Sequence, residues 1–204
     1  MTPTESTATR DKVRTRKAIL EAAVLLMTEQ GAGVSLADIA SQAGVSKGAL
    51  THHFTSRSAL EEGILSDTAQ RFWSDVHAHV DLSENRPGKL LRAYIRALTT
   101  DSDTTREVFS PSSILTVIGN NATVQQFLVH DAETWRGAFG ADGIEPGLSL
   151  VLRHAAEGLA SCIDTPYLSA EELDVARARL LLMAEADEGD QGTSSRLPPH
   201  EASR

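Results

Sequence analysis

The sequence predicts an all-α protein of about nine helices, with a small N-terminal unit and a larger helical body. Two observations predict this fold class. Apolar residues recur at helical spacing through most of the 204 residues. Pro and Gly divide these stretches, and no alternating run of Val, Ile and Thr is long enough to indicate a sheet.

The composition is that of a globular protein, with 41% hydrophobic and 23% charged residues. The single cysteine, Cys162, excludes an internal disulfide and a cysteine-based metal cluster. No apolar run approaches the ~20 residues that cross a bilayer, and the N-terminal segment lacks the apolar stretch of a secretory signal. These features predict a cytoplasmic protein with no membrane partner.

The net charge of −9 is unevenly divided along the chain. Residues 1–60 carry seven Lys and Arg against five Asp and Glu, whereas residues 61–204 carry 12 against 23. This asymmetry suggests a head that faces a polyanion and a body that faces something else. A merely solvated surface is the alternative interpretation.

The first helix is expected to begin at about Asp11 and to end at Gly31. Residues 1–9 are rich in Thr, Ser and Pro and predict a disordered tail. Apolar residues then follow the helical period, and Gly31 ends the run as a C-terminal cap does. Five basic residues near the start of this helix form a possible phosphate-binding or minor-groove arm, or else a solvated helix end: Arg10, Lys12, Arg14, Arg16 and Lys17.

Two short helices joined by a glycine turn are expected next. Ser35 and Asp38 have the spacing of a capping box and predict a helix to about Gln42. Gly44 supplies the turn, and Ser46 caps a third helix that ends near His53. The free face of this third helix carries small or hydrogen-bonding residues that can enter a DNA major groove: Ser46, Lys47, Gly48, Thr51 and His52. The alternative is a helical corner without a ligand.

Prolines, glycines and caps set the expected limits of the later helices. Pro87, Pro111 and Pro146 each have the position of a first-turn proline. Ser169 and Glu172 form a second capping box, and the chain after Ala186 reads as a loose tail, 187–204. Helices are therefore expected at about 56–80, 87–99, 111–118, 122–138, 146–162 and 170–186.

The segment from Ile19 to Leu60 resembles the N-terminal DNA-binding domain of the TetR family of transcriptional regulators. The resemblance is carried by ILEAA (19–23), SLADIASQAGVSKGALTHHF (35–54) and TSRSAL (55–60). It implies a DNA-binding domain over 10–56 and an effector-binding and dimerisation domain over 57–186. The family usually has Tyr at position 51 and Lys at position 57, where this chain has Thr and Arg. The resemblance also implies DNA contacts from Ser35, Ser46, Lys47, Gly48, Thr51, His52 and Arg57.

One helix-turn-helix reads few base pairs, so a homodimer on a palindromic operator is expected. The last two helices carry broad apolar stripes that suit a two-fold interface, although a monomer core would give the same pattern. The candidate interface residues are Leu148, Val151, Leu152, Ala155, Leu159, Leu173, Leu180 and Met183.

The resemblance implies that residues from the middle of the sequence form a pocket for a small-molecule effector. The candidate residues are mostly apolar or aromatic and predict a hydrophobic ligand, uncharged or weakly acidic. No cofactor is expected. No metal site is expected either, because His77 and His79 are two residues apart on a helix and point in different directions. The effector candidates are Phe72, Trp73, His77, Tyr94, Phe109, Ile114, Phe127 and Trp135.

The sequence therefore predicts a repressor that binds a palindromic operator as a dimer and is released by a small molecule. An activator or a regulator that answers to no ligand remains an alternative, and a helical enzyme or scaffold is a remote one. The sequence shows no Gly-rich phosphate loop, no Ser-His-Asp arrangement and no paired carboxylates of a catalytic site. An enzyme is therefore not expected.

Overall fold

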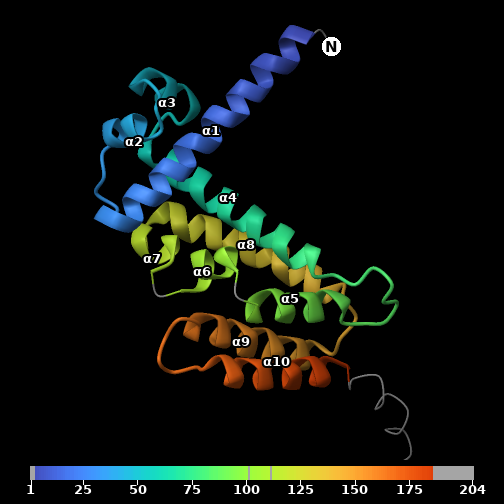
Figure 1. Cartoon of the computed structure of the whole chain (residues 1–204). Coiled ribbons are helices and arrows are strands. Elements are labelled where there is room, and N and C mark those ends of the chain that lie inside the picture. Colours follow the sequence, from blue (N-terminus) through green and yellow to red (C-terminus); the bar gives the residue numbers. More distant parts are fainter. Residues whose placement is uncertain (1–2, 101, 111, 186–204) are drawn as a thin grey trace, which may run out of the picture.

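The computed structural model describes residues 3–100, 102–110 and 112–185, and these ranges contain ten α-helices and no strand (Figure 1). The predicted all-α class is confirmed. The helix count exceeds the expected nine or so because the chain between Ser102 and Gly119 forms two short helices, α6 (Asp103–Phe109) and α7 (Ile114–Ile118). The predicted tail at 187–204 lies outside the described residues.

The head consists of α1 (Pro3–Gln30), α2 (Leu36–Gln42) and α3 (Lys47–His53). Helix α1 is longer than expected, because the described residues 3–9 are helical and not a tail. Pro3 occupies the first helical position, which tolerates proline, and no Gly or Pro follows before Gly31. In Figure 1 the first part of α1 extends past α3.

Helix α4 (Arg57–Ala78) runs from the head into the body, where it lies along α8 (Ala122–Gly140). Below this pair in Figure 1 lies α5 (Lys89–Thr99), followed by a layer of two helices. These are α9 (Pro146–Cys162) and α10 (Ala170–Glu185). The expected limits of α9 are reproduced, because Glu145 caps the helix and Pro146 occupies its first turn.

The start of α5 differs from the expected proline-initiated one. The helix is capped by Gly88, whose φ of 82° lies in the left-handed region, so it begins at Lys89. Asp142, distant in sequence, accepts hydrogen bonds from the backbone N–H groups of Leu90 and Leu91, each at 2.8 Å. A carboxylate from another part of the chain therefore satisfies the first turn, which local sequence cannot reveal.

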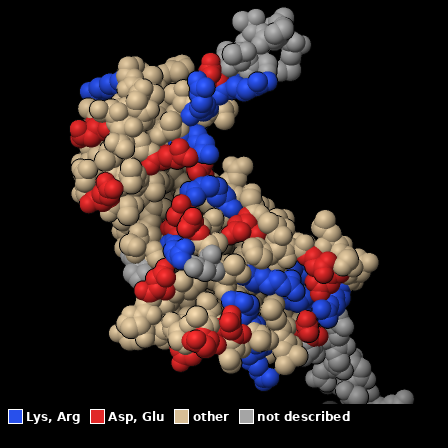
Figure 2. Space-filling view, in the orientation of Figure 1, with Lys and Arg blue, Asp and Glu red and all other residues tan. Residues whose placement is uncertain are grey.

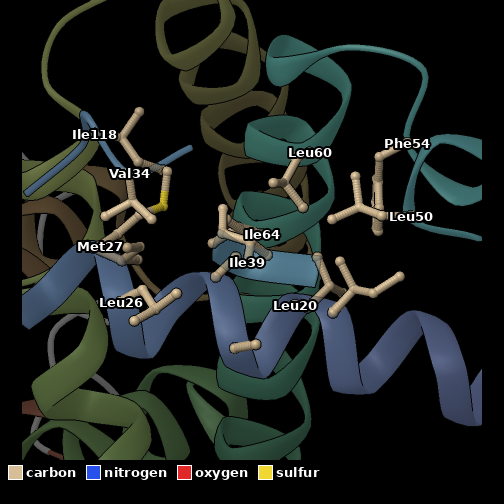
Figure 3. Close-up of a cluster of buried hydrophobic side chains, with 14 of the residues drawn as sticks. Leu20, Leu26, Met27, Val34, Ile39, Leu50, Phe54, Leu60, Ile64 and Ile118 are labelled. Atoms are coloured by element: carbon tan, nitrogen blue, oxygen red, sulfur yellow. The ribbon is translucent and has the colours of Figure 1, made fainter. Parts of the chain in front are cut away.

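One core joins the head to the body. Leu20, Ile39, Leu50 and Leu60 are buried together from α1 to α4, and Ile118 of α7 packs against the same cluster (Figure 3). Each fully buried side chain of this kind contributes about 1.5–3 kcal/mol to folding. Because α7 shares this core, a displacement of α7 acts directly on the packing of the head.

Arg92 of α5 links this helix to the loop before it and to the end of α10. Arg92 is 1% exposed, and its Nε lies 2.9 Å from Oε1 of Glu84. Its other nitrogens donate to the carbonyl oxygens of Ala184 and Pro87, at 2.9 and 2.7 Å. Burial alone would raise the pKa of Glu84, but hydrogen bonds from Arg86 and Arg92 hold it below its ordinary value.

Gly63 of α4 packs closely against Phe54, the C-cap of α3. A Cβ at this position would meet Cε1 of Phe54 at 2.6 Å, so we expect Gly63→Ala to lower the free energy of unfolding by about 1–3 kcal/mol. The matched control is Gly137→Ala on α8, where a Cβ meets nothing within 4 Å. Urea unfolding of both variants checks this, and equal stabilities would contradict the close packing.

Candidate nucleic-acid interface and effector cavity

Local capping fixes the two helices of the reading head. The Ser35 hydroxyl accepts from the backbone N–H of Asp38 at 3.1 Å and donates to its carboxylate at 2.6 Å. The Ser46 hydroxyl accepts from the N–H of Ala49 at 3.1 Å, and Gly44 turns the chain between the helices with a φ of 67°. The predicted helix-turn-helix is confirmed.

The outward face of α3 is fully available. Ser46, Lys47, Gly48, Thr51 and His52 are all exposed. Lys47 and Thr51, and likewise Gly48 and His52, are four residues apart and therefore lie side by side on the helix surface. The Thr51 hydroxyl donates to the carbonyl oxygen of Lys47 at 2.8 Å, so its oxygen and methyl group remain available to a partner. A Cβ on Gly48 would meet only Ser46 Oγ, at 3.9 Å, so the helix backbone there is bare. This face can approach a base-pair edge closely.

The basic residues of α1 extend this face. Arg10, Lys12, Arg14, Arg16 and Lys17 are exposed, and Figure 2 shows Lys and Arg gathered on the upper part of α1. The Arg16 guanidinium lies 5.1 Å from the Phe54 ring centroid, at the end of α3.

The positive charge of α1 reaches the C-terminal end of α3. Burial lowers the pKa of His53, and the neighbouring His52, Lys12 and Arg16 lower it further. These charges can act on the same phosphate backbone as α3.

Arg57 does not share this face. Its side chain is 28% exposed, and its Nη1 and Nη2 donate to the carbonyl oxygens of Val34 and Ala32 at 2.7 and 2.5 Å. Its Nε lies 2.9 Å from Oε1 of Glu61. The guanidinium therefore fastens the loop between α1 and α2 to α4, and this arrangement argues against the predicted phosphate contact. The sequence alone could not reveal this role, because the backbone partners of Arg57 lie more than 20 positions away. A basic residue at the start of a helix is then expected to be exposed to solvent.

Glu61 links the same cluster to α8. It is only 8% exposed, and its Oε2 accepts a hydrogen bond from Nδ2 of Asn121 at 3.0 Å. The Oδ1 of Asn121 in turn caps α8 by accepting from the N–H of Val124 at 3.0 Å. Sequence reasoning missed both residues, because nothing local connects positions 60 apart.

A cavity of about 50 Å³ lies between α4, α6, α7 and α8. Of the effector candidates, Phe72, Ile114, Phe127 and Trp135 line it. A larger hollow of about 860 Å³ lies between α1, α4 and α6, but its lining includes the ion-paired Arg71 and Glu107 and other charged groups. The smaller cavity fits an apolar ligand better.

The other four effector candidates lie outside the cavity lining. The Trp73 ring lies 4.4 Å from that of Trp135 and 4.6 Å from that of His77, which is exposed. Phe109 packs on Phe72 with ring centroids 5.5 Å apart. The set therefore divides among the cavity, the aromatic core beside it and, for His77, the protein surface.

Tyr94 has a structural partner in the body core. Its hydroxyl donates to Oε1 of Glu157 at 2.9 Å. Burial raises the pKa of Tyr94 well above its ordinary value, and Glu157 raises it further. The hydroxyl is therefore protonated and engaged inside the body.

Several apolar side chains are exposed on the outer side of α9 and α10. Val151 of the predicted interface is 61% exposed, and Ala155 is exposed one turn further on. Leu152 and Leu180 are buried in the protomer and cannot form an interface, which corrects their assignment. Leu148, Leu159, Leu173 and Met183 are half-buried, and sequence reasoning missed the exposed Leu150, Val175 and Leu182.

These features define a DNA-binding regulator: a helix-turn-helix head with an exposed third helix, packed against a larger helical body. The family model of bacterial regulatory proteins of the tetR family matches residues 19–63. The model of the tetracyclin repressor-like C-terminal domain matches residues 88–185, so the two cover most of the chain. The protein belongs to the TetR family of transcriptional regulators, and it is not an enzyme.

Solved structures share this architecture. A transcriptional regulator from Rhodococcus sp. Rha1 is 21% identical, with a TM-score of 0.64 over 83% of this chain and 95% of its own. A putative transcriptional regulator from Pseudomonas aeruginosa PAO1 is 16% identical, with a TM-score of 0.64 over 84% and 90%. NalD from Pseudomonas aeruginosa is 22% identical, with a TM-score of 0.56 over 86% and 96%. At these identities the likeness shows the fold.

No curated protein sequence matches the chain significantly. None of the helices in the described ranges has the length and apolar character that a membrane span requires.

Gly48 offers a test of close approach by α3. A methyl group fits the protein there without strain and favours the helix, so Gly48→Ala should keep or raise stability, by up to about 1 kcal/mol. The same methyl should hold the helix away from the groove and weaken DNA binding. Anisotropy titration and thermal unfolding separate the effects, and unchanged DNA affinity would place the contact elsewhere.

Lys47 and Arg57 should behave differently when their charges are removed. Lys47→Ala should leave stability unchanged, weaken binding to all sequences alike and reduce the salt slope by about 1. Arg57→Met leaves Glu61 buried without its cation, so we expect a stability loss of about 3–5 kcal/mol. A reduced salt slope in Arg57→Met without loss of stability would instead support the predicted contact between Arg57 and a DNA phosphate.

Proposed function

We propose that the protein is a transcriptional repressor that binds a palindromic operator as a homodimer and is released by a small molecule. The observation that carries this proposal is the exposed face of α3, made of small and hydrogen-bonding residues with one lysine and no acidic residue, beside the basic α1. Its place of action would be the cytoplasm, where a bacterial regulator meets chromosomal DNA. NalD, a structural neighbour, is described as the secondary repressor of a multidrug efflux pump, which favours repression over activation.

The outer face of α9 and α10, with its exposed apolar side chains, supports dimer formation. Val151, Val175 and Leu182 are each more than half exposed, which is costly for a monomer in water. Burying this face against a second copy about a two-fold axis would present two α3 helices. Successive major grooves on one side of DNA are about 34–36 Å apart, so a two-fold pair matches a palindrome.

The cavity supports release by a small molecule. Nine of its eleven lining residues are apolar, so a largely apolar effector fits it best. Ile114 of α7 lines the cavity and also belongs to the core that holds the head. A ligand larger than 50 Å³ must displace such residues, which would move the head relative to the body. The ligand must favour this displaced state for release to follow.

The test is binding to a palindromic duplex against a scrambled one, at 50 and 200 mM salt. If six to ten phosphates are contacted, affinity should fall by about 10³–10⁵ over this range. Equal affinity for both duplexes, or a flat salt response, would contradict the proposal.

Introducing a charged residue into the proposed dimer interface tests whether the protein is a dimer. Val151→Asp should halve the mass in solution and weaken operator binding, because a carboxylate cannot be buried there unpaired. Val129→Asp, at a 60% exposed position of α8, is the matched control and should remain dimeric. Light scattering gives the mass, and an unchanged mass in Val151→Asp would place the interface elsewhere.

A further inference from the structure

The effector cavity contains one carboxylate, that of Asp131, among apolar and aromatic side chains. We propose that this cavity selects a positively charged, largely apolar ligand and that Asp131 is its counter-ion. The inference rests on the proposed function, since it assigns a ligand class to the same cavity.

Asp131 lies on the face of α8 that lines the cavity. Phe127 and Trp135, four residues before and after it, line the same space. The other polar lining residue is Thr68, and the described lining includes no Lys, Arg or His. No hydrogen bond or ion pair within the described residues engages the Asp131 carboxylate. A cation entering the cavity therefore meets an unneutralised acid.

The surroundings of Asp131 make a bound cation favourable. Burial raises the pKa of Asp131, and the neighbouring His130 opposes this only in part. A carboxylate that has lost part of its hydration is stabilised by a neighbouring positive charge and destabilised by a negative one. The aromatic side chains of Phe72, Phe127 and Trp135 line the same cavity, where a cation can be attracted by their rings.

This proposal differs from the expectation of an uncharged or weakly acidic effector. An acidic ligand would place a second negative charge beside Asp131. A neutral ligand that accepts a hydrogen bond from protonated Asp131 is the competing hypothesis, and the test below separates the two.

The cavity size selects the probes. About 50 Å³ accommodates little more than an ammonium group and a few carbons, so the probes must be slim. The matched set is hexylammonium, hexanol and hexanoate, which share one chain and differ in charge. Leu128, 38% exposed at the edge of the cavity, lies where the chain of such a probe would leave.

Calorimetric titration at about pH 8 measures the three affinities. Hexylammonium should bind the wild type at least about tenfold more tightly than hexanol, and hexanoate the most weakly. Asp131→Asn should bring hexylammonium to the level of hexanol and leave hexanol unchanged. Glu133→Gln, exposed two positions along α8, removes the same net charge and should change nothing.

Three results would overturn the assignment: equal affinities in the wild type, a retained ammonium preference in Asp131→Asn, or binding of none of the probes. Circular dichroism and operator binding confirm that the variants are folded. Release of a preformed operator complex is measured separately by anisotropy.

Operator release is scored independently of ligand charge. Asp131-dependent binding of hexylammonium without release would support the cation site and contradict the proposed effector function. Equal release by hexanol and hexylammonium in wild type and Asp131→Asn would support that function and overturn the role of Asp131.

Discussion

The guanidinium of Arg57 is the interaction on which the position of the DNA-binding head depends. It donates to two carbonyl oxygens of the loop between α1 and α2 and pairs with the buried Glu61 on α4. Glu61 in turn accepts a hydrogen bond from the side-chain amide of Asn121, the N-cap of α8. A carboxylate this deeply buried is tolerated only when it is paired. The head, α4 and α8 are therefore joined by one continuous polar chain.

This chain and the shared core give the molecule its functional arrangement. The exposed face of α3 depends on a head held at one angle, and Ile118 of α7 packs inside that head. The cavity lies next to α7 and α8, so the elements that surround a ligand are those that hold the head. A small change at the cavity can reach the DNA-binding face because packed cores shift between discrete arrangements and do not deform smoothly.

Local chemistry explains what the sequence could predict. Ser35, Ser46 and Pro146 act within their own helix turns, so the limits of α2, α3 and α9 were predictable. Periodicity placed the residues of α3 on one face, and that face is exposed.

Long-range packing explains what the sequence could not predict. Periodicity does not say what covers a helix face, so Leu152 was assigned to an interface although the protomer buries it. The inward position of Arg57, the Glu61–Asn121 bond and the place of Asp131 depend on distant segments meeting. The most direct test of this account is a double-mutant cycle on unfolding free energy with Arg57→Met and Asn121→Ser, the serine keeping the helix cap. The account predicts an interaction energy of about 0.5–3 kcal/mol, whereas additivity within about 0.5 kcal/mol would show that the two residues act independently and would contradict it.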